Sequence, residues 1–104
     1  MAQFDVFENP NEKTHQSMPY LLDVQSDLPN NLTTRAVVPL VAASAMGRAV
    51  KHLNPEFAIK NHPALMSTTE LAGIPVRSLG EKAGSLKEKR DEIIAALDFI
   101  FSGF

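Results

Sequence analysis

SLKEKRDEIIAALDFIFSGF, the sequence of residues 85–104, decides the fold because it predicts one long helix that needs a surface to pack on. Ser85 and Glu88 have the spacing of a capping box, in which both side chains satisfy free backbone N–H groups at the start of a helix. Gly103 stands where a left-handed cap belongs, so we expect the helix to end there, with Phe104 in contact with Phe99. Between these ends, apolar residues recur at the three- and four-residue steps of an amphipathic helix: Leu86, Ile93, Leu97, Ile100 and Phe101.

The second half of this predicted helix is apolar on nearly all sides, since Asp98 is the only polar residue from Ile93 to Phe101. Such a helix has to be covered on more than one side, and so short a chain can cover only part of it. A helix C-terminus carries partial negative charge, so Asp98 and the terminal carboxylate have the unfavourable sign there. A basic partner would turn this repulsion into attraction. The alternative is that the helix simply closes the core and that Phe104 frays in solvent.

The composition is that of one soluble globular domain, residues 1–104, with 44% apolar and 21% charged residues. A formal net charge of -2 gives no electrostatic basis for binding a nucleic-acid backbone directly. Because cysteine is absent, disulfides, thiolate metal sites and cysteine nucleophiles are excluded. Neither an export signal nor a membrane-spanning stretch is indicated, so we expect a cytoplasmic protein.

Before the helix, apolar and polar residues alternate, or apolar residues follow one another, over short stretches. Turn-forming residues separate these stretches, which is typical of short strands. The connection 9–19 is polar and predicts a hairpin. Leu28 and Leu32 are expected to project from a loop of turn formers at 27–34. Pro39 implies a sheet edge or the point where ladder bonding ends, because proline has no N–H. Residues 42–51 form either a helical turn or a loop. The predicted strands cover residues 3–8, 20–25, 35–41, 56–60, 64–69 and 74–79, with a turn at 61–63 and a break at 70–73.

Five or six short strands followed by one helix, without βαβ alternation, predict a mainly β protein. We expect a small antiparallel barrel or bent sheet with the helix packed alongside it.

No catalytic or metal-binding pattern stands out. His15, His52 and His62 lack the spacing of a helical metal pair and are expected to be exposed in loops. Ser67, Thr68 and Thr69 are expected on a solvated strand face. The sequence therefore indicates no metal and no cofactor.

Arg35, Glu70 and His15 form a hypothetical ribonuclease site, since phosphoryl chemistry uses an arginine with an acid or a histidine. The spacing does not select these residues, however, and Arg35 is more simply a charged residue at the start of a strand. We therefore expect a protein that is not an enzyme.

Several short blocks, taken together and in this order, resemble the CcdB family, the toxins of toxin–antitoxin pairs that attack DNA gyrase. Singly each block is weak, but together they span almost the whole chain. They are Gln3-Phe4, Asp23-Val24-Gln25-Ser26-Asp27, Arg35-x-Val37-Val38-Pro39-Leu40, Met66-x-Thr68-Thr69, Ile74-Pro75-Val76, Gly80-Glu81 and the terminal Gly103-Phe104.

The resemblance implies an SH3-like barrel with an appended sheet and a C-terminal helix, assembled as a homodimer. It implies that the dimer inserts its helix ends into the gyrase A subunit and traps that enzyme on cleaved DNA. Carried over by motif, the gyrase-binding residues are Leu28 in the loop and Asp98, Ser102, Gly103 and Phe104 at the helix end. Ser102 stands where well-known toxic members have tryptophan, so an attenuated homologue that only dimerises and binds antitoxin is the alternative.

The resemblance also implies an antitoxin of the CcdA type, which neutralises the toxin and makes the DNA contact when the complex represses its own operon. The connection 9–19 is a candidate antitoxin contact. A ribonuclease of the Kid and MazF barrel class is the third hypothesis, and it is disfavoured because their N-terminal arginine–glycine motif is missing here.

Overall fold

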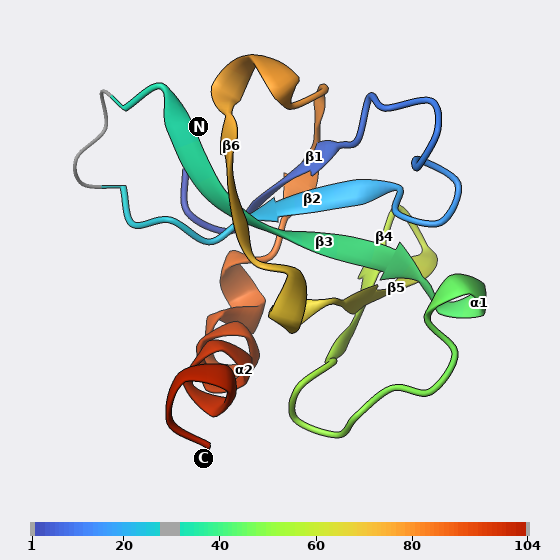
Figure 1. Cartoon of the computed structure of the whole chain (residues 1–104), viewed down its shortest axis with the longest axis vertical. Helices are drawn as coiled ribbons and strands as arrows, with labels where there is room; N and C mark the ends of the chain where they lie inside the picture. The colour runs from blue at the N-terminus through green and yellow to red at the C-terminus, as the bar shows by residue number, and fades with distance from the viewer. Residues whose placement is uncertain (1, 28–31, 104) are drawn as a thin grey trace.

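The computed structural model describes residues 2–27 and 32–103. These residues form seven strands, two α-helices and three short 3-10 helices (Figure 1). The strands are β1 (Asp5–Glu8), β2 (Tyr20–Asp23), β3 (Thr34–Ala42), β4 (Glu56–Ile59), β5 (His62–Met66), β6 (Ala72–Pro75) and β7 (Lys82–Ser85). The helices are α1 (Ala43–Met46), α2 (Arg90–Ser102), η1 (Thr68–Glu70), η2 (Val76–Ser78) and η3 (Lys87–Lys89).

All strand pairs are antiparallel, and the strand order is β4-β5-β3-β2-β1-β7, with β6 paired to β3 off this path. The sheet bends into a half-barrel and α2 leaves it at the end of the chain (Figure 1). The fold class predicted from the sequence, mainly β and antiparallel with one long C-terminal helix, is therefore confirmed. The predicted hairpin around residues 9–19 is also confirmed, because β1 pairs with β2.

Strand β3 is the centre of the sheet, which corrects the expectation that Pro39 marks an edge strand. On one side β3 pairs with β2, and Pro39 lies opposite Leu21. On its other side β3 pairs first with β6, up to Val37, and then with β5, from Leu40 onward. Pro39 stands between these two partners, where a missing N–H costs no ladder bond, and its carbonyl accepts from the Ser67 N–H at 2.9 Å. The second part of the prediction, that ladder bonding ends at Pro39, is confirmed on this side.

The main core lies on one face of the sheet, where alternate residues of each strand meet. Val6, Leu22, Val38 and Leu40 are fully buried there with Met66. Ile93 and Ala96 of α2 close this core and are also fully buried.

The opposite face of β1, β2 and β3 is buried as well, by Phe7, Leu21 and Val37. Both faces of the central strands are therefore covered, which explains why β3 is apolar from Ala36 to Ala42.

Several predicted boundaries were wrong. The turn after β4 is formed by Lys60 and Asn61, both with positive φ (51° and 67°), which is the two-residue hairpin geometry, so His62 already belongs to β5. Strand β6 begins at Ala72, inside the expected break, and ends at Pro75. Strand β7 was not predicted at all. Residues 42–51, left open between helix and loop, contain the single turn α1.

The predicted strand 64–69 ends at Met66, and of the three hydroxyl residues that follow it only Thr69 is exposed to solvent. Ser67 and Thr68 are both buried. The Thr68 hydroxyl donates to the carbonyl of Leu53, and the Ser67 hydroxyl donates to the Glu70 carboxylate. The first of these bonds ties the start of η1 to the loop after α1, and the second closes η1 on itself.

The capping box expected at the start of the C-terminal helix is not formed. Ser85 is the last residue of β7, with its backbone opposite Asp5, and its hydroxyl accepts from the Lys87 N–H at 3.3 Å. Strand pairing thus holds Ser85 in an extended conformation, and the helix opens with the 3-10 turn η3 before α2 begins at Arg90.

Candidate functional site

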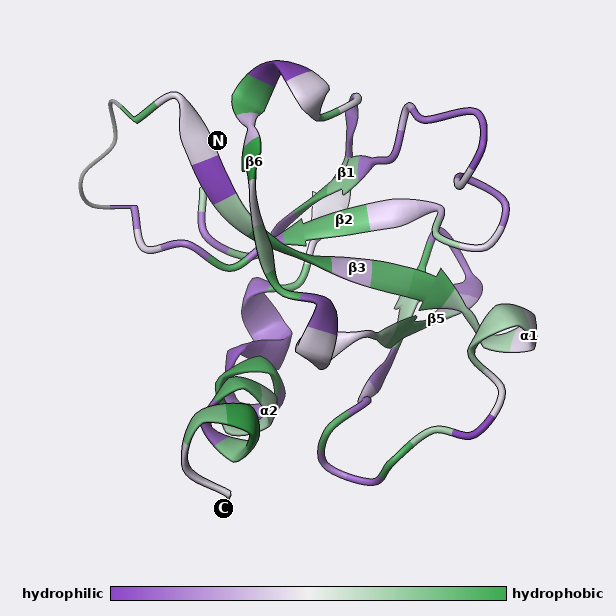
Figure 2. Cartoon of the chain, in the orientation of Figure 1, coloured by the Kyte–Doolittle hydropathy of each residue, from purple (hydrophilic) through white to green (hydrophobic). Residues whose placement is uncertain are grey.

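The C-terminal half of α2 is only partly covered by the rest of the molecule. The buried residues of the whole helix, Ile93 and Ala96, lie in its first two turns. Farther along, Phe101 is 73% exposed, the largest exposure among the large apolar residues that the structure describes. Figure 2 shows the helix changing from hydrophilic at its first turn to hydrophobic toward the C-terminus, which points away from the strands. The prediction that the protein can cover only part of this helix is confirmed.

The end of α2 has a defined geometry. Gly103 has φ 79° and ψ 17°, and its N–H donates to the carbonyl of Phe99 at 2.9 Å, so the predicted left-handed cap is confirmed. The Ser102 hydroxyl donates to the carbonyl of Asp98 at 2.7 Å. Asp98, Ser102 and Gly103 are all exposed. The helix therefore presents a preformed end on which the exposed Phe101 side chain and the Asp98 carboxylate are neighbours, because they are three residues apart.

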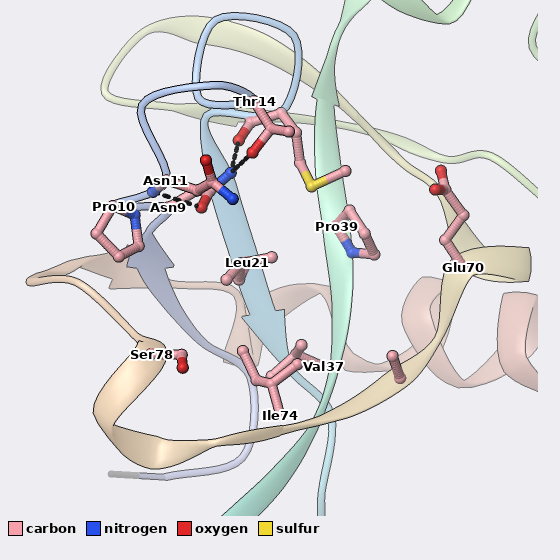
Figure 3. Close-up of a pocket in the computed structure, with 12 residues that line it drawn as sticks. Asn9, Pro10, Asn11, Thr14, Leu21, Val37, Pro39, Glu70, Ile74 and Ser78 are labelled. Atoms are coloured by element: carbon pink, nitrogen blue, oxygen red, sulfur yellow. Dashed lines mark hydrogen bonds between the residues drawn. The ribbon is translucent and has the colours of Figure 1, made fainter.

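A second surface feature is a groove of about 530 Å³ on the outer face of β2 and β3 (Figure 3). Its floor is apolar and consists of Leu21, Val37 and Pro39. One wall is the connection between β1 and β2, and the other is formed by η1, β6 and η2. The wall residues are Asn9, Pro10, Asn11, Thr14, Met18, Glu70, Ala72, Ile74 and Ser78.

Asn9 holds the first wall in place. Its side-chain Nδ2 donates to the Thr14 hydroxyl and to the Met18 carbonyl, each at 2.9 Å, and its Oδ1 accepts from the Asn11 N–H at 3.1 Å (Figure 3). One side chain thus satisfies three groups of the connection, so the wall is ordered before any partner arrives. Among the described residues that line the groove, Glu70 is the one with a charged side chain.

A comparison with known families assigns this architecture. The model of the CcdB protein family matches residues 3–103. The chain belongs to the CcdB family.

CcdB-family proteins are toxins of toxin–antitoxin systems, so the family supports a toxin with an antitoxin partner. Among solved structures, the chain is similar to an endoribonuclease in complex with its cognate antitoxin from a mycobacterial species. The TM-score is 0.76 at 12% sequence identity, and the match covers 97% of this chain and 94% of that one. At this identity the likeness describes the fold alone. Within residues 2–27 and 32–103, neither helix has the length and apolar character that a membrane crossing requires.

The structure brings three of the five expected gyrase-binding residues of this CcdB-family chain together. Asp98, Ser102 and Gly103 lie within the last turn and cap of α2 and are exposed. Leu28 and Phe104 lie outside the described residues, as does the expected contact between Phe104 and Phe99. Sequence reasoning did not single out the exposure of Phe101, because it counted this residue with the core-facing stripe.

The residues of the hypothetical ribonuclease site are not assembled into one. Arg35 is 4% exposed and forms two hydrogen bonds with the Asp23 carboxylate. Its Nε donates to Oδ2 at 2.8 Å and its Nη2 donates to Oδ1 at 3.1 Å. It is thus a buried structural residue at the start of β3, where the sequence placed a charged residue at the start of a strand. Glu70 accepts from Ser67, and His15 is exposed on the connection 9–19.

The Asp23 carboxylate is fully buried, and its electrostatics follow from that burial. Loss of solvent raises the pKa of Asp23 above its ordinary value, and the hydrogen bonds from Arg35 and from the Gln25 N–H oppose this shift. Asp5, also buried, raises the pKa of Asp23 further through charge repulsion. Sequence analysis missed this cluster because the two partners of the ion pair come from different strands.

His52 and His62 are exposed, like His15. Among the residues that the structure describes, no group of three or more histidines and acidic side chains is placed to hold a metal ion.

Proposed function

We propose that this toxin acts by binding the A subunit of DNA gyrase with the end of α2 and by trapping that enzyme on cleaved DNA. The observation that carries the proposal is the exposed, preformed helix end, where Phe101 is 73% exposed beside Asp98. Beside Phe101 on α2, Phe99 and Ile100 are partly exposed, and apolar side chains that gather in one exposed place mark interaction surfaces. In this proposal the toxin poisons an enzyme by binding to it and is not itself an enzyme.

The electrostatics of the helix end favour a basic partner. The last carbonyls of a helix carry a partial negative charge of about half an electron, and here no basic residue lies in the last turn to balance it. The Asp98 carboxylate adds a full charge at the same place. A basic cleft that also has an apolar pocket would satisfy both the charge and the aromatic side chain.

The toxin acts as a homodimer in this proposal, which would present two helix ends to the target. Support comes from apolar residues of α2 that remain partly exposed in the single chain: Ile94, Leu97, Phe99 and Ile100. A second copy would cover part of this surface and leave the last turn free.

The groove beside the connection 9–19 is the proposed contact of a CcdA-type antitoxin. Its apolar floor suits apolar side chains of an extended segment, and Glu70 suits a lysine or arginine of that segment. Because the toxin has a formal net charge of -2, the complex would touch its operon DNA through the antitoxin when it acts as a repressor.

The proposal is tested by expression in a bacterium that lacks the antitoxin, and by binding to the isolated gyrase A subunit. We expect growth arrest, linearised plasmid DNA and saturable binding. Deletion of residues 103–104 should abolish binding with little change in the melting temperature, because Gly103 is exposed and lies beyond the helix. Loss of folding in this deletion would place the two residues in the core and contradict the proposal.

Ser102 favours one alternative, an attenuated toxin that dimerises and binds antitoxin without killing, since no tryptophan is present at the helix end. Harmless expression together with tight antitoxin binding would support it. Incubation of the purified toxin with RNA, read out as strand cleavage, tests the ribonuclease hypothesis in the same series.

A further inference from the structure

Strand β4 forms one end of the main sheet. Within the described residues it pairs with β5 alone, in an unbroken register over all four of its residues. The other end, β7, is distorted, because its register with β1 skips Ala83. Bulges and prolines are two of the features that protect a sheet edge from pairing with another chain, and β4 has neither. Strand β4 is therefore a regular sheet edge.

The backbone groups that β4 directs away from β5 belong to Glu56 and Ala58. The Pro55 carbonyl, just before β4, accepts from the Met66 N–H at the end of β5, at 2.9 Å. In a strand, the N–H and C=O groups of successive residues point to alternate sides. Those of Phe57, two residues after Pro55, therefore also point toward β5. Those of Glu56 and Ala58 point toward the free edge.

The exposed side chains of β4 are arranged symmetrically about Ala58. Phe57 and Ile59 are buried in the core, whereas Glu56 and Ala58 lie on the opposite face and are exposed. Lys60, the next residue at this spacing, is exposed as well. A negative charge thus precedes Ala58 by two residues, and a positive charge follows it by two.

We propose that β4 pairs with β4 of a second copy of this chain, antiparallel and about a two-fold axis beside Ala58. In this register the two Ala58 residues donate their N–H groups to each other's carbonyls, because these groups face outward on each copy. Glu56 of each copy lies opposite Lys60 of the other. Charged residues usually guard an edge against pairing, but opposite charges placed symmetrically about the centre attract each other.

The charges favour this register over the adjacent one. A two-fold axis beside Phe57 would place Glu56 of one copy opposite Ala58 of the other. The two Glu56 carboxylates would then be diagonal neighbours and repel each other. With the axis beside Ala58, each carboxylate instead has an ammonium group opposite it, and the small alanine side chains meet at the centre.

A hollow lies beside the place where the turn of the second copy arrives. Counted from the centre at Ala58, Asn61 of the second copy is opposite Pro55. Pro55 belongs to the lining of a hollow of about 230 Å³. The one acid in this lining, Glu92, suits the positive charge of Lys60 in the same turn. The lining residues are His52, Pro55, Glu92 and Ala95.

This contact does not involve α2, which is the surface of the homodimer in the proposed function. It therefore stands or falls separately from that function. Because β4 is short, the pair buries less than the roughly 1,200–2,000 Å² of a standard interface, and we expect it to form at high protein concentration. A chain that uses both contacts would build assemblies larger than a dimer.

The first experiment measures the mass of the full chain by sedimentation equilibrium at low salt and rising concentration. Glu56→Lys and Lys60→Glu each place like charges opposite each other twice, and each should weaken self-association through β4 by about tenfold or more. An equimolar mixture of these two variants restores both opposite-charge pairs. It should associate within about threefold of the unchanged protein.

Matched controls make the same changes of net charge outside β4. Glu88→Lys and Lys89→Glu change exposed residues of η3 and should leave self-association unchanged. This comparison separates the opposed pairs at β4 from a general effect of net charge.

Hydrogen exchange of the unchanged chain locates the contact. The Ala58 N–H should exchange slowly at high concentration and fast after dilution, whereas the Phe57 N–H, which faces β5, should stay protected at both. Ala58→Pro removes the outward N–H at a position where an edge strand tolerates proline. It should abolish the β4 contact with little change in the melting temperature, and the charge variants decide the question if it fails to fold.

A mixture that associates no better than either charge variant alone would overturn the proposed register. An Ala58 N–H that exchanges equally fast at all concentrations would overturn the edge contact, even if the chain dimerises through α2. Protection of this N–H that appears only with a cognate antitoxin bound would assign the edge to that partner and overturn the second copy as its occupant.

Discussion

Replacement of Phe101 by alanine separates the role of the helix end in binding from its role in folding. Phe101 is 73% exposed, so about a quarter of its side chain is covered in the single chain. A phenylalanine can bury roughly 200 Å². The covered part, at about 25 cal/mol per Å², corresponds to about 1 kcal/mol. Phe101→Ala should therefore lower the free energy of unfolding by about 1 kcal/mol or less.

The expected loss in binding is larger than the loss in stability. Truncation of an aromatic anchor at the centre of an interface typically weakens the binding free energy by about 2–4 kcal/mol, which raises the Kd roughly 30- to 1,000-fold. Titration of the gyrase A subunit by calorimetry or surface plasmon resonance measures this change. Denaturant unfolding of the same sample measures the change in stability.

Ile93→Ala is the matched control on the same helix. Ile93 is fully buried, so its truncation should cost about 2–5 kcal/mol of stability. Gyrase affinity per folded molecule should stay within about threefold, because a core residue does not touch the partner. The reasoning about Phe101 would be refuted if Phe101→Ala left gyrase affinity unchanged, or if it destabilised the protein as much as Ile93→Ala.

The remaining predictions concern one close approach, one buried acid and the helix end. A Cβ on Gly80 would lie 2.6 Å from the Glu8 carbonyl oxygen, so Gly80→Ala should lower the free energy of unfolding by about 1–3 kcal/mol. Gly84 has open space around it, so Gly84→Ala should not lower the stability in this way. Thermal unfolding measures both variants, and equal effects would contradict the prediction. Burial raises the pKa of Asp23, so its contribution to stability is complete below the unfolded pKa and is lost as the pH rises through the folded pKa. Asp23→Asn should therefore lower the free energy of unfolding more in acid than at neutral pH. Denaturant titrations at several pH values measure this loss, and a loss of stability that does not decrease as the pH rises would contradict the prediction. Ser102→Trp should strengthen gyrase binding by about tenfold or more, because Ser102 is exposed and has room for an anchor, and unchanged affinity would speak against the carried-over site.

Local sequence patterns predicted those parts of the molecule that depend on neighbouring residues. The hairpin between β1 and β2 was predictable from two alternating runs around a polar connection, and it is present. The helix end was predictable because glycine adopts the left-handed cap without a steric cost, and Gly103 does so with φ 79°. The family could be inferred from short blocks in a fixed order, and the family match over residues 3–103 confirms it.

Features that depend on residues distant in sequence were decided by the tertiary structure. Ser85 has the spacing of a helix cap, but pairing with Asp5 places it in a strand, because ladder bonds of the folded sheet outweigh a local capping preference. Pro39 predicted an edge, yet β3 is central because two successive partners share one of its sides.

Sequence by itself determined which residues are apolar, that β1 and β2 form a hairpin, and how the C-terminal helix ends. Only the tertiary structure decided that Arg35 pairs with Asp23 in the interior, that the Gln3 N–H donates to Asp27, and that Phe101 stays in solvent. The physical reason is that periodicity indicates which face of an element a residue occupies. What covers that face depends on packing between elements, and a chain of 104 residues covers the first turns of α2 but leaves its end exposed.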